Sequence, residues 1–300
     1  MSSPFDLNNG EAYLRWRDRK LANAITNIEE LIVEIRDPRA LTKAEQEALL
    51  ARCHRSNMVI YAIHNAAADE IQVDEENVRQ FGSMFGLNRL DANWLAGEQG
   101  VTRVTVCEDN GQRQAYIPYT DRAIKWHTDG YYNPPEQQVR SFVLHCVQSA
   151  GQGGENRLLD HEIAYLMLRD ENNDFIRALS APDAMTIPER TDEQGIARAA
   201  QTGPVFSIDP ASGALHMRYT ARTRSIVWKR EEATLAAVAA LEKFLASNLP
   251  HIHRTRLEPG MGLLCNNVLH DRAAFNDTPG QPRLLYRARY YDRISETSPG

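Results

Sequence analysis

Cysteine is scarce in this sequence, and its spacing excludes several kinds of protein. The 300 residues include four cysteines, and no pair of them has the close spacing of a thiol-based zinc site. Scattered cysteines in a chain of this size favour free, buried thiols in a reducing compartment. We therefore expect a cytoplasmic protein without a disulfide scaffold.

Long apolar runs and an excess of positive charge are also missing. The longest apolar stretches, such as residues 58–63, are far shorter than the roughly 20 residues of a membrane-spanning helix. The first residues lack the basic and apolar regions of a secretory signal. The net charge of −6 argues against general electrostatic binding to nucleic acid or to an anionic membrane. We expect a globular protein whose partner is a small molecule.

Short strand-like segments, rich in β-branched and aromatic residues, dominate the chain and are interrupted by a few helices. Strands are predicted at 31–35, 58–63, 101–107, 114–117, 139–147, 156–159, 205–208, 214–219, 251–257, 262–265 and 283–291. Helices are predicted at 11–22, 42–53, 77–85, 160–168 and 231–247. This pattern indicates a mainly β fold, a barrel or sandwich, with flanking helices. Since no linker or repeat divides residues 1–300, we predict one domain, with a peripheral N-terminal helix within residues 1–25.

One short motif could bind a metal. Trp126-His-Thr-Asp129 contains the one His-x-Asp of the chain, and residues i and i+2 of an extended segment point to the same face. His270 follows the apolar run 263–269, which places it at or just past a strand end. Two histidines and one carboxylate with open positions form the ligand pattern of non-haem Fe(II) oxygenases.

Two arginines follow on the next predicted strand. If that strand forms a hairpin with the His270 segment, Arg283 lies beside the metal, and Arg287 shares its face. A guanidinium can bind a carboxylate through two hydrogen bonds. Taken singly, each residue also has an ordinary structural explanation, such as a hydrogen-bonded loop histidine or a surface ion pair. Their occurrence together, in order and at strand ends, favours a metal site.

An ordered series of motifs resembles the taurine dioxygenase superfamily of Fe(II)/2-oxoglutarate oxygenases. Within it, the chain is similar to the gamma-butyrobetaine hydroxylase-like branch. The resemblance covers residues 31–292. The motifs are Tyr119-Thr120, His127-Thr-Asp129, Leu144-His-Cys146, Gly153-Gly-Glu-Asn156, Leu158-Leu-Asp160, Asn267-Val-Leu-His-Asp-Arg272 and Arg283-Leu-Leu-Tyr-Arg287.

The resemblance implies a double-stranded β-helix, or jelly roll, core decorated by helices. It also implies Fe(II), 2-oxoglutarate and O2 as cofactor and co-substrates. His127, Asp129 and His270 match the family's iron ligands.

The same resemblance assigns the co-substrate contacts. Arg283 matches the arginine that binds the C5 carboxylate of 2-oxoglutarate. Arg287 matches a second arginine, near the C1 carboxylate or the substrate anion. Asn156 stands where the family usually has Thr or Ser, and its amide can donate a hydrogen bond to the C5 carboxylate.

The substrate-binding residues are the least constrained part of the prediction. Tyr119 matches a position of the aromatic cage that holds trimethylammonium in the butyrobetaine hydroxylase branch. The arginines near residue 220 could bind a carboxylate, sulfonate or phosphonate, or could pair with acidic surface residues. The candidates are Trp94, Tyr119, Tyr131, Tyr132, Arg218 and Arg222.

The sequence therefore predicts an Fe(II)- and 2-oxoglutarate-dependent dioxygenase. It would hydroxylate a small polar or charged metabolite (an amino acid, a betaine, or a carboxylate, sulfonate or phosphonate) and release succinate and CO2. A zinc-dependent hydrolase with the same three ligands and a non-catalytic jelly-roll sensor are the alternatives. Family habit predicts a homo-oligomer.

Overall fold

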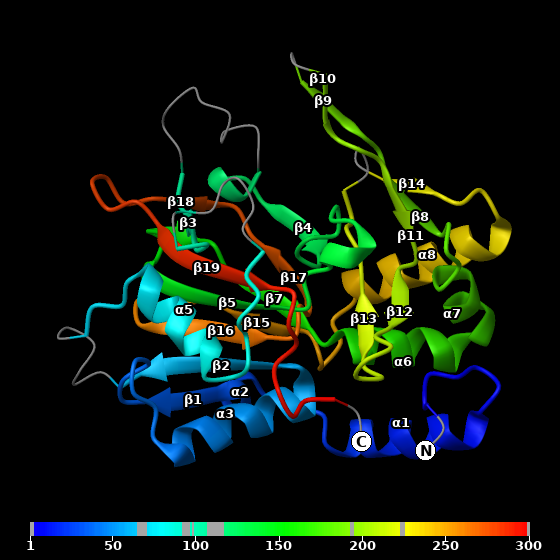
Figure 1. The fold of residues 1–300 in the computed structure, drawn as a ribbon, viewed down its shortest axis with the longest axis horizontal. Helices are drawn as coiled ribbons and strands as arrows, with labels where there is room; N and C mark the ends of the chain where they lie inside the picture. The colour runs from blue at the N-terminus through cyan, green and yellow to red at the C-terminus, as the bar shows by residue number, and fades with distance from the viewer. Residues whose placement is uncertain are drawn as a thin grey trace.

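Two β-sheets form the centre of the molecule (Figure 1). The computed structural model describes residues 3–64, 71–91, 97, 99–106, 117–192, 195–222 and 226–298. The six-stranded sheet has the order β1 (Ile32–Ile35), β2 (Met58–Ile63), β16 (Met261–Cys265), β5 (Ser141–Gln148), β19 (Leu284–Tyr290) and β3 (Thr102–Val104). The four-stranded sheet has the order β15 (His253–Thr255), β7 (Asn156–Leu159), β17 (Leu269–Arg272) and β4 (Ile124–His127).

Alternating side chains along the strands build two hydrophobic layers. In β16, Leu263 and Cys265 join a core cluster that also contains Leu158 of the four-stranded sheet. Leu264 points the other way, into a cluster with residues of the flanking helices. This alternation follows from the two-residue period of a strand. The inner cluster therefore packs the two sheets together, as in a double-stranded β-helix.

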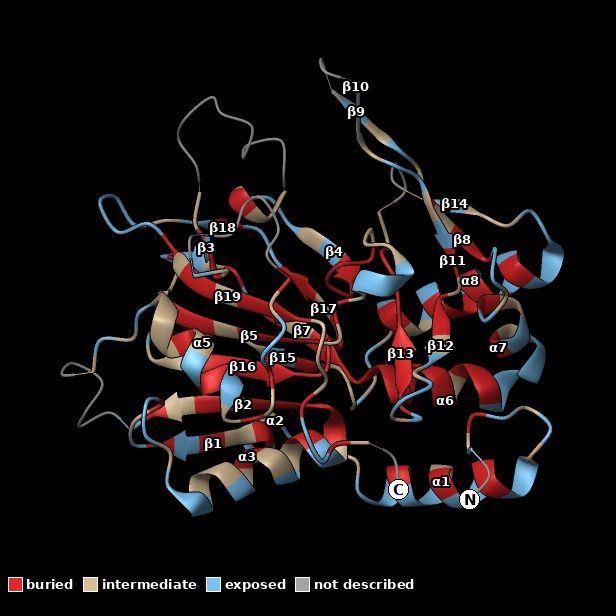
Figure 2. Ribbon diagram, in the orientation of Figure 1, coloured by how far each residue is buried: buried red, intermediate tan, exposed pale blue. Residues whose placement is uncertain are grey.

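Helices cover the outer face of the six-stranded sheet. The elements on this side are α3 (Lys43–Ser56) and α5 (Glu75–Ser83), whereas Leu31 of the short α2 (Ile28–Leu31) belongs to the inner cluster. At the start of α3, Thr42 and Glu45 form a capping box. Leu49 of α3 and Phe81 of α5 are buried in the cluster against this sheet. Figure 2 shows the buried residues concentrated in the strands and on the inner sides of the helices.

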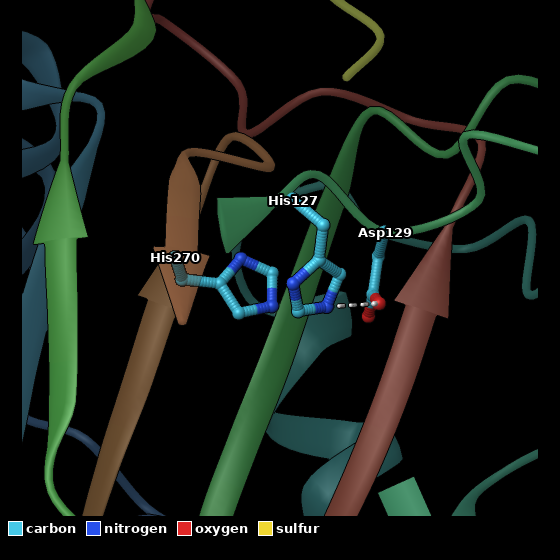
Figure 3. Close-up of side chains that lie close together, drawn as sticks. All are labelled: His127, Asp129 and His270. Carbon is cyan, nitrogen blue, oxygen red and sulfur yellow. Dashed lines mark ion pairs between the residues drawn. The ribbon is translucent and has the colours of Figure 1, made fainter. Parts of the chain in front are cut away.

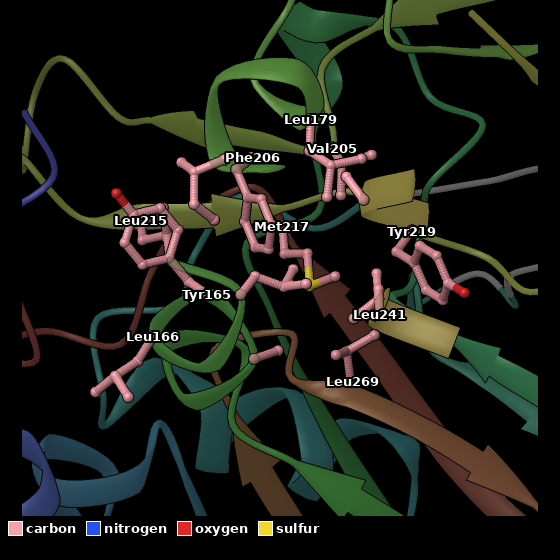
Figure 4. Close-up of a cluster of buried hydrophobic side chains, with 14 of the residues drawn as sticks. Tyr165, Leu166, Leu179, Val205, Phe206, Leu215, Met217, Tyr219, Leu241 and Leu269 are labelled. Atoms are coloured by element: carbon pink, nitrogen blue, oxygen red, sulfur yellow. The ribbon is translucent and has the colours of Figure 1, made fainter. Parts of the chain in front are cut away.

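A second group of helices packs beside the four-stranded sheet. It comprises α1 (Gly10–Ala22), α6 (His161–Glu171), α7 (Asn173–Leu179) and α8 (Glu232–Ala246). Asp160 caps the start of α6 by accepting a hydrogen bond from the Glu162 amide. Figure 4 shows the cluster here, where Leu241 and Leu269 meet side chains such as Met217.

Several short strands form an insertion between α7 and α8. They are β8 (Met185–Ile187), β9 (Arg190–Asp192), β10 (Gly195–Arg198), β11 (Gln201–Gly203), β12 (Phe206–Ile208), β13 (Leu215–Met217) and β14 (Val227–Trp228). The β9–β10 hairpin projects from the body in Figure 1. A small pair, β6 (Gln152–Gly153) and β18 (Phe275–Asn276), lies elsewhere in the fold.

The insertion is attached to the edge of the four-stranded sheet. His127, at the end of β4, forms an isolated bridge with Thr220. The amide and hydroxyl of Thr128 both hydrogen-bond the backbone of Tyr219. The insertion therefore lies directly against the strand that carries the His-x-Asp motif.

The N-terminal helix lies at the edge of the molecule and is firmly packed. Tyr13 and Trp16 of α1 are buried in the same cluster as α6. Lys20 is buried too, with its Nζ 2.6 Å from Asp160 and 2.5 Å from Glu162. Among the described residues, no helix is both long and apolar enough to cross a membrane.

Candidate metal centre

The two histidines predicted to bind a metal lie opposite each other on neighbouring strands. The register of β17 and β4 pairs His270 with His127, and their ring centroids are 4.1 Å apart. Figure 3 shows the two rings side by side, with the carboxylate of Asp129 next to His127. One ligand atom from each of these three residues lies within 4.8 Å of the other two.

Backbone carbonyls orient both imidazoles. The Nδ1 atom of His127 lies 2.9 Å from the Lys125 carbonyl, and that of His270 lies 3.0 Å from the Val268 carbonyl. A proton on each Nδ1 satisfies its carbonyl and leaves the Nε2 lone pair for a metal. Burial and the neighbouring His270 lower the pKa of His127 to about 3. The ring is therefore neutral at neutral pH, which is its metal-binding form.

Asn267 fixes the backbone of Asp129, a role that the sequence analysis did not predict. Its Oδ1 accepts a hydrogen bond from the Asp129 amide at 2.7 Å. Its Nδ2 donates to the carbonyls of Asp129 at 2.9 Å and of Val139 at 2.6 Å. The φ angle of Asn267 is 50°, in the left-handed region that asparagine tolerates better than most residues. Its place in the motif that precedes His270 was the one available signal.

Two arginines of β19 act electrostatically on the carboxylate of Asp129. The Nη1 atom of Arg287 lies 3.3 Å from the Asp129 carboxylate, and Arg289 pairs with Asp91 at 2.5 Å. Burial raises the pKa of Asp129, but the charges of Arg287 and Arg289 outweigh burial and bring the pKa below its ordinary value. Asp129 is therefore ionised at neutral pH.

Two details of the sequence prediction are wrong. The apolar run before His270 divides into β16 and β17, which belong to different sheets, so His270 lies within a strand of its own. The strand after Arg283 is not the hairpin partner of the His270 segment, because β19 pairs with β5 and β3. Arg287 reaches Asp129 from the other sheet. The chain changes sheets at Asn266 and Asn267, in the middle of the segment that the prediction treated as one apolar run.

Arg283 is buried and forms no ion pair with a carboxylate among the residues that the structure describes. It directly precedes β19, and its guanidinium carbon lies 5.1 Å from the centre of the Phe275 ring. Burial lowers the pKa of Arg283 to about 10, so the side chain is still protonated at neutral pH. No carboxylate of the described residues lies within 4.0 Å of this guanidinium. Because an unpaired buried charge is costly, the position fits an anionic ligand.

The other predicted co-substrate contact is engaged within the sheet. Asn156 lies in β7, and its Nδ2 donates to the Asp271 carbonyl at 2.8 Å. Its contact with 2-oxoglutarate stays a prediction. The Gly154 backbone, two residues earlier, approaches Arg283 closely, since a Cβ at Gly154 would lie 3.8 Å from the Arg283 Nε.

Three of the predicted substrate residues lie near the metal ligands. The Tyr131 ring lies edge-on to His127 at a centroid distance of 6.5 Å, and the Tyr132 ring lies 5.2 Å from Tyr131. Arg222 of the insertion donates to the Tyr131 hydroxyl at 3.5 Å. Tyr119 is buried in a short 3-10 helix, Ile117–Tyr119. Trp94 lies outside the described residues.

Arg218 has a different environment. Its guanidinium donates to the backbone carbonyls of Tyr131 at 2.8 Å and Gln201 at 2.7 Å, and it also contacts that of Met185. It lines a cavity of about 380 Å³ together with Arg140, and none of the three metal-site residues lines this cavity. Arg218 thus braces the insertion against the segment after Asp129, and we leave it out of the proposed substrate site.

Comparison with known proteins places these residues in a family context. A Uridine-5'-phosphate dioxygenase from Amycolatopsis sp is 32% identical over 170 residues, which cover 55% of this chain and 60% of that protein. A second, from Streptomyces sp, is 27% identical over 216 residues, covering 68% and 74%. The chain thus matches less than two thirds of the length of the first of these relatives.

Solved structures show the same fold. Asparagine oxygenase in complex with Fe(II), 2S,3S-3-hydroxyasparagine and succinate superposes with a TM-score of 0.60 at 14% identity. The superposition covers 97% of this chain and 86% of that one. It confirms the predicted double-stranded β-helix with flanking helices. The model of the Taurine catabolism dioxygenase TauD, TfdA family matches residues 18–289. The chain therefore belongs to the TauD, TfdA family of dioxygenases, as its motifs predicted.

Proposed function

We propose that the chain is an Fe(II)- and 2-oxoglutarate-dependent dioxygenase in which His127, Asp129 and His270 hold the iron. The observation that carries the proposal is the cluster itself: two neutral imidazoles and one ionised carboxylate whose ligand atoms lie within 4.8 Å of one another. This donor set occupies one face of a metal and leaves other positions open. When bound, iron(II) supplies the oxygen chemistry, and one O2 converts substrate and 2-oxoglutarate into hydroxylated product, succinate and CO2.

The side chains of β19 support the assignment of the co-substrate. Arg283 offers an unpaired guanidinium for one carboxylate of 2-oxoglutarate. Arg287 lies against Asp129, where it can hold the other carboxylate or the substrate while it offsets the negative charge. A dianionic co-substrate bound here would give the buried Arg283 guanidinium a carboxylate partner.

The substrate proposed for this site is a small metabolite with an anionic group. Uridine-5'-phosphate is the first compound to test, because it is the compound in the names of both curated relatives. Amino acids, betaines, sulfonates and phosphonates complete the panel. The family match supports neither the zinc hydrolase nor the non-catalytic sensor.

Anaerobic addition of Fe(II) and 2-oxoglutarate to the purified protein tests the metal site. We expect a weak visible charge-transfer band, and its loss in His127→Ala. Folded wild-type protein without the band would contradict the proposal.

The co-substrate assignment has its own test. Arg283→Ala should weaken 2-oxoglutarate binding about tenfold or more, because hydrogen bonds to charged groups contribute about 1.5–3 kcal/mol. It should leave Fe(II) affinity unchanged. Arg254→Ala is the matched control, since Arg254 is exposed on β15. Substrate-triggered succinate release that survives Arg283→Ala at the wild-type 2-oxoglutarate affinity would show that this arginine does not bind the co-substrate.

A further inference from the structure

The segment after Asp129 presents two tyrosines that are contacted by arginines from three different elements. Arg289 of β19 donates to the Tyr132 hydroxyl at 2.9 Å. Arg198, the last residue of β10, places its guanidinium carbon 5.6 Å from the centre of the Tyr132 ring. Arg222 reaches the Tyr131 hydroxyl. The site thus gathers positive charge beside the predicted metal ligands.

These arginines differ in whether their charge is compensated. Arg289 is paired with Asp91, and Arg287 with Asp129. Within the described residues, neither Arg198 nor Arg222 has a carboxylate within 4.0 Å.

Arg198 shows the effect of its position most clearly. It is partly buried, one of its donors meets the Pro188 carbonyl at 2.7 Å, and its Nε lacks a hydrogen-bond partner among the described residues. Burial lowers the pKa of Arg198 and outweighs the opposite effect of Tyr131 and Tyr132, while the positive charge of Arg190 adds a smaller lowering. A side chain that is partly desolvated, near another cation and short of acceptors is suited to an anion.

The charges of the loaded site indicate how much negative charge the substrate can carry. Fe(II) together with the Asp129 carboxylate leaves one positive unit, and the two carboxylates of 2-oxoglutarate cancel the charges of Arg283 and Arg287. Arg198 and Arg222 add two more. A phosphate monoester carries about −1.5 to −2 charges at neutral pH and accepts hydrogen bonds through three oxygens. It matches the two remaining guanidinium groups better than a single carboxylate does.

Resting on the proposed function, we infer that Arg198 and Arg222 together hold the phosphate of a phosphorylated substrate, such as a nucleoside 5'-monophosphate, beside Tyr131 and Tyr132 and so next to His127. Both residues belong to the insertion, whereas the metal ligands belong to the sheets or directly follow them. Tyr131 and Tyr132 connect the two sets of residues, because Tyr131 lies beside His127 while Arg222 and Arg198 contact Tyr131 and Tyr132. No sequence pattern singles out Arg198, because its hairpin is distant in the chain from every recognised motif.

Calorimetric titration of the Fe(II)- and 2-oxoglutarate-loaded protein, without oxygen, tests this inference. The probes are uridine-5'-phosphate and uridine, which differ by the phosphate alone. Wild-type protein should bind uridine-5'-phosphate at least about 100-fold more tightly than uridine. Arg198→Ala and Arg222→Ala should each reduce this preference about tenfold or more. Either substitution should change the affinity for uridine less than about twofold relative to the wild type. Arg230→Ala, an exposed arginine after β14, is the control and should behave as wild type.

Two results would overturn the inference. One is a wild-type protein that binds both probes equally, and the other is a variant that weakens both probes by the same factor, as a purely structural role would. The charge-transfer band separates this failure from failure of the proposed function. A band without a preference for the phosphate contradicts the phosphate site alone, whereas a preference without the band contradicts the metal assignment alone.

Discussion

Asn267 connects the loop after β16 to Asp129 through both ends of its amide. Replacing it with alanine removes three hydrogen bonds and leaves buried backbone groups of Asp129 and Val139 unpaired. We expect Asn267→Ala to lower the free energy of unfolding by about 2–4 kcal/mol and to weaken Fe(II) binding. Urea denaturation and metal titration measure the two effects. Asn173→Ala, at an exposed asparagine, is the control, and an unchanged Fe(II) affinity in Asn267→Ala would show that the amide does not position Asp129.

At this scale, the sequence predicted the residues whose role depends on local spacing. His127 and Asp129 are two positions apart and face the same way, so their partnership is visible without a structure. Arg198 and Asn267 were not predicted because their partners are distant in the chain. Arg198 belongs to no sequence motif, and only the fold brings its guanidinium over the ring of Tyr132.

The α1 helix is joined to α6 by one buried cation and two carboxylates. Lys20→Met keeps the length of the side chain but leaves Asp160 and Glu162 buried without a counter-charge. We expect a loss of about 3–5 kcal/mol in the free energy of unfolding. The double variant Lys20→Met/Glu162→Gln should recover part of this loss, because one of the two charges is gone.

Chemical denaturation of these variants provides the measurement. Lys43→Met is the matched control, because Lys43 forms an exposed i,i+4 pair on α3 and such pairs contribute about 0–1 kcal/mol. If Lys20→Met is as stable as Lys43→Met, the buried cation does not anchor the helix.

Elements with clear boundaries were predicted well, and changes of sheet were not. The strand at 58–63 and the strand at 156–159 match β2 and β7, because turn or capping residues border both. The apolar period predicted α8 within a residue at each end. The strand predicted at 114–117 lies almost entirely outside the described residues. The division between β16 and β17 depends on Asn266 and Asn267, whose side chains bind backbone on other elements. Such hydrogen bonds between distant segments cannot be predicted from the periodicity of apolar residues.

Buried histidines should make the whole fold sensitive to acid. Burial lowers the pKa of His145 to about 4, of His216 to about 3 and of His253 to about 4. In the unfolded chain these groups titrate near 6.5. Below that pH the unfolded state binds more protons than the folded state, so stability falls between about pH 6.5 and pH 4 and is fully present above 6.5.

Each such group contributes a slope of up to about 1.4 kcal/mol per pH unit. Urea denaturation between pH 5 and pH 7 measures this dependence. His145→Gln should reduce the slope, whereas His54→Gln, at an exposed histidine, should not. An identical slope in wild type and His145→Gln would show that His145 does not contribute to the pH dependence of stability.

The homo-oligomer suggested by family habit is a separate prediction, which sedimentation of the purified protein would test.

The bridge between His127 and Thr220 has a consequence for how such enzymes diversify. It joins the sheet that carries His127 and His270 to the insertion that carries Arg198 and Arg222, and the Thr128 hydroxyl adds a hydrogen bond from the Tyr219 amide. Under the two proposals above, recognition belongs to the insertion and oxidation to the sheets, which are separate stretches of chain. Exchange of residues 184–228 between relatives should transfer substrate preference and leave the iron site intact. Selection could in this way redirect one oxidising centre toward new metabolites without rebuilding it.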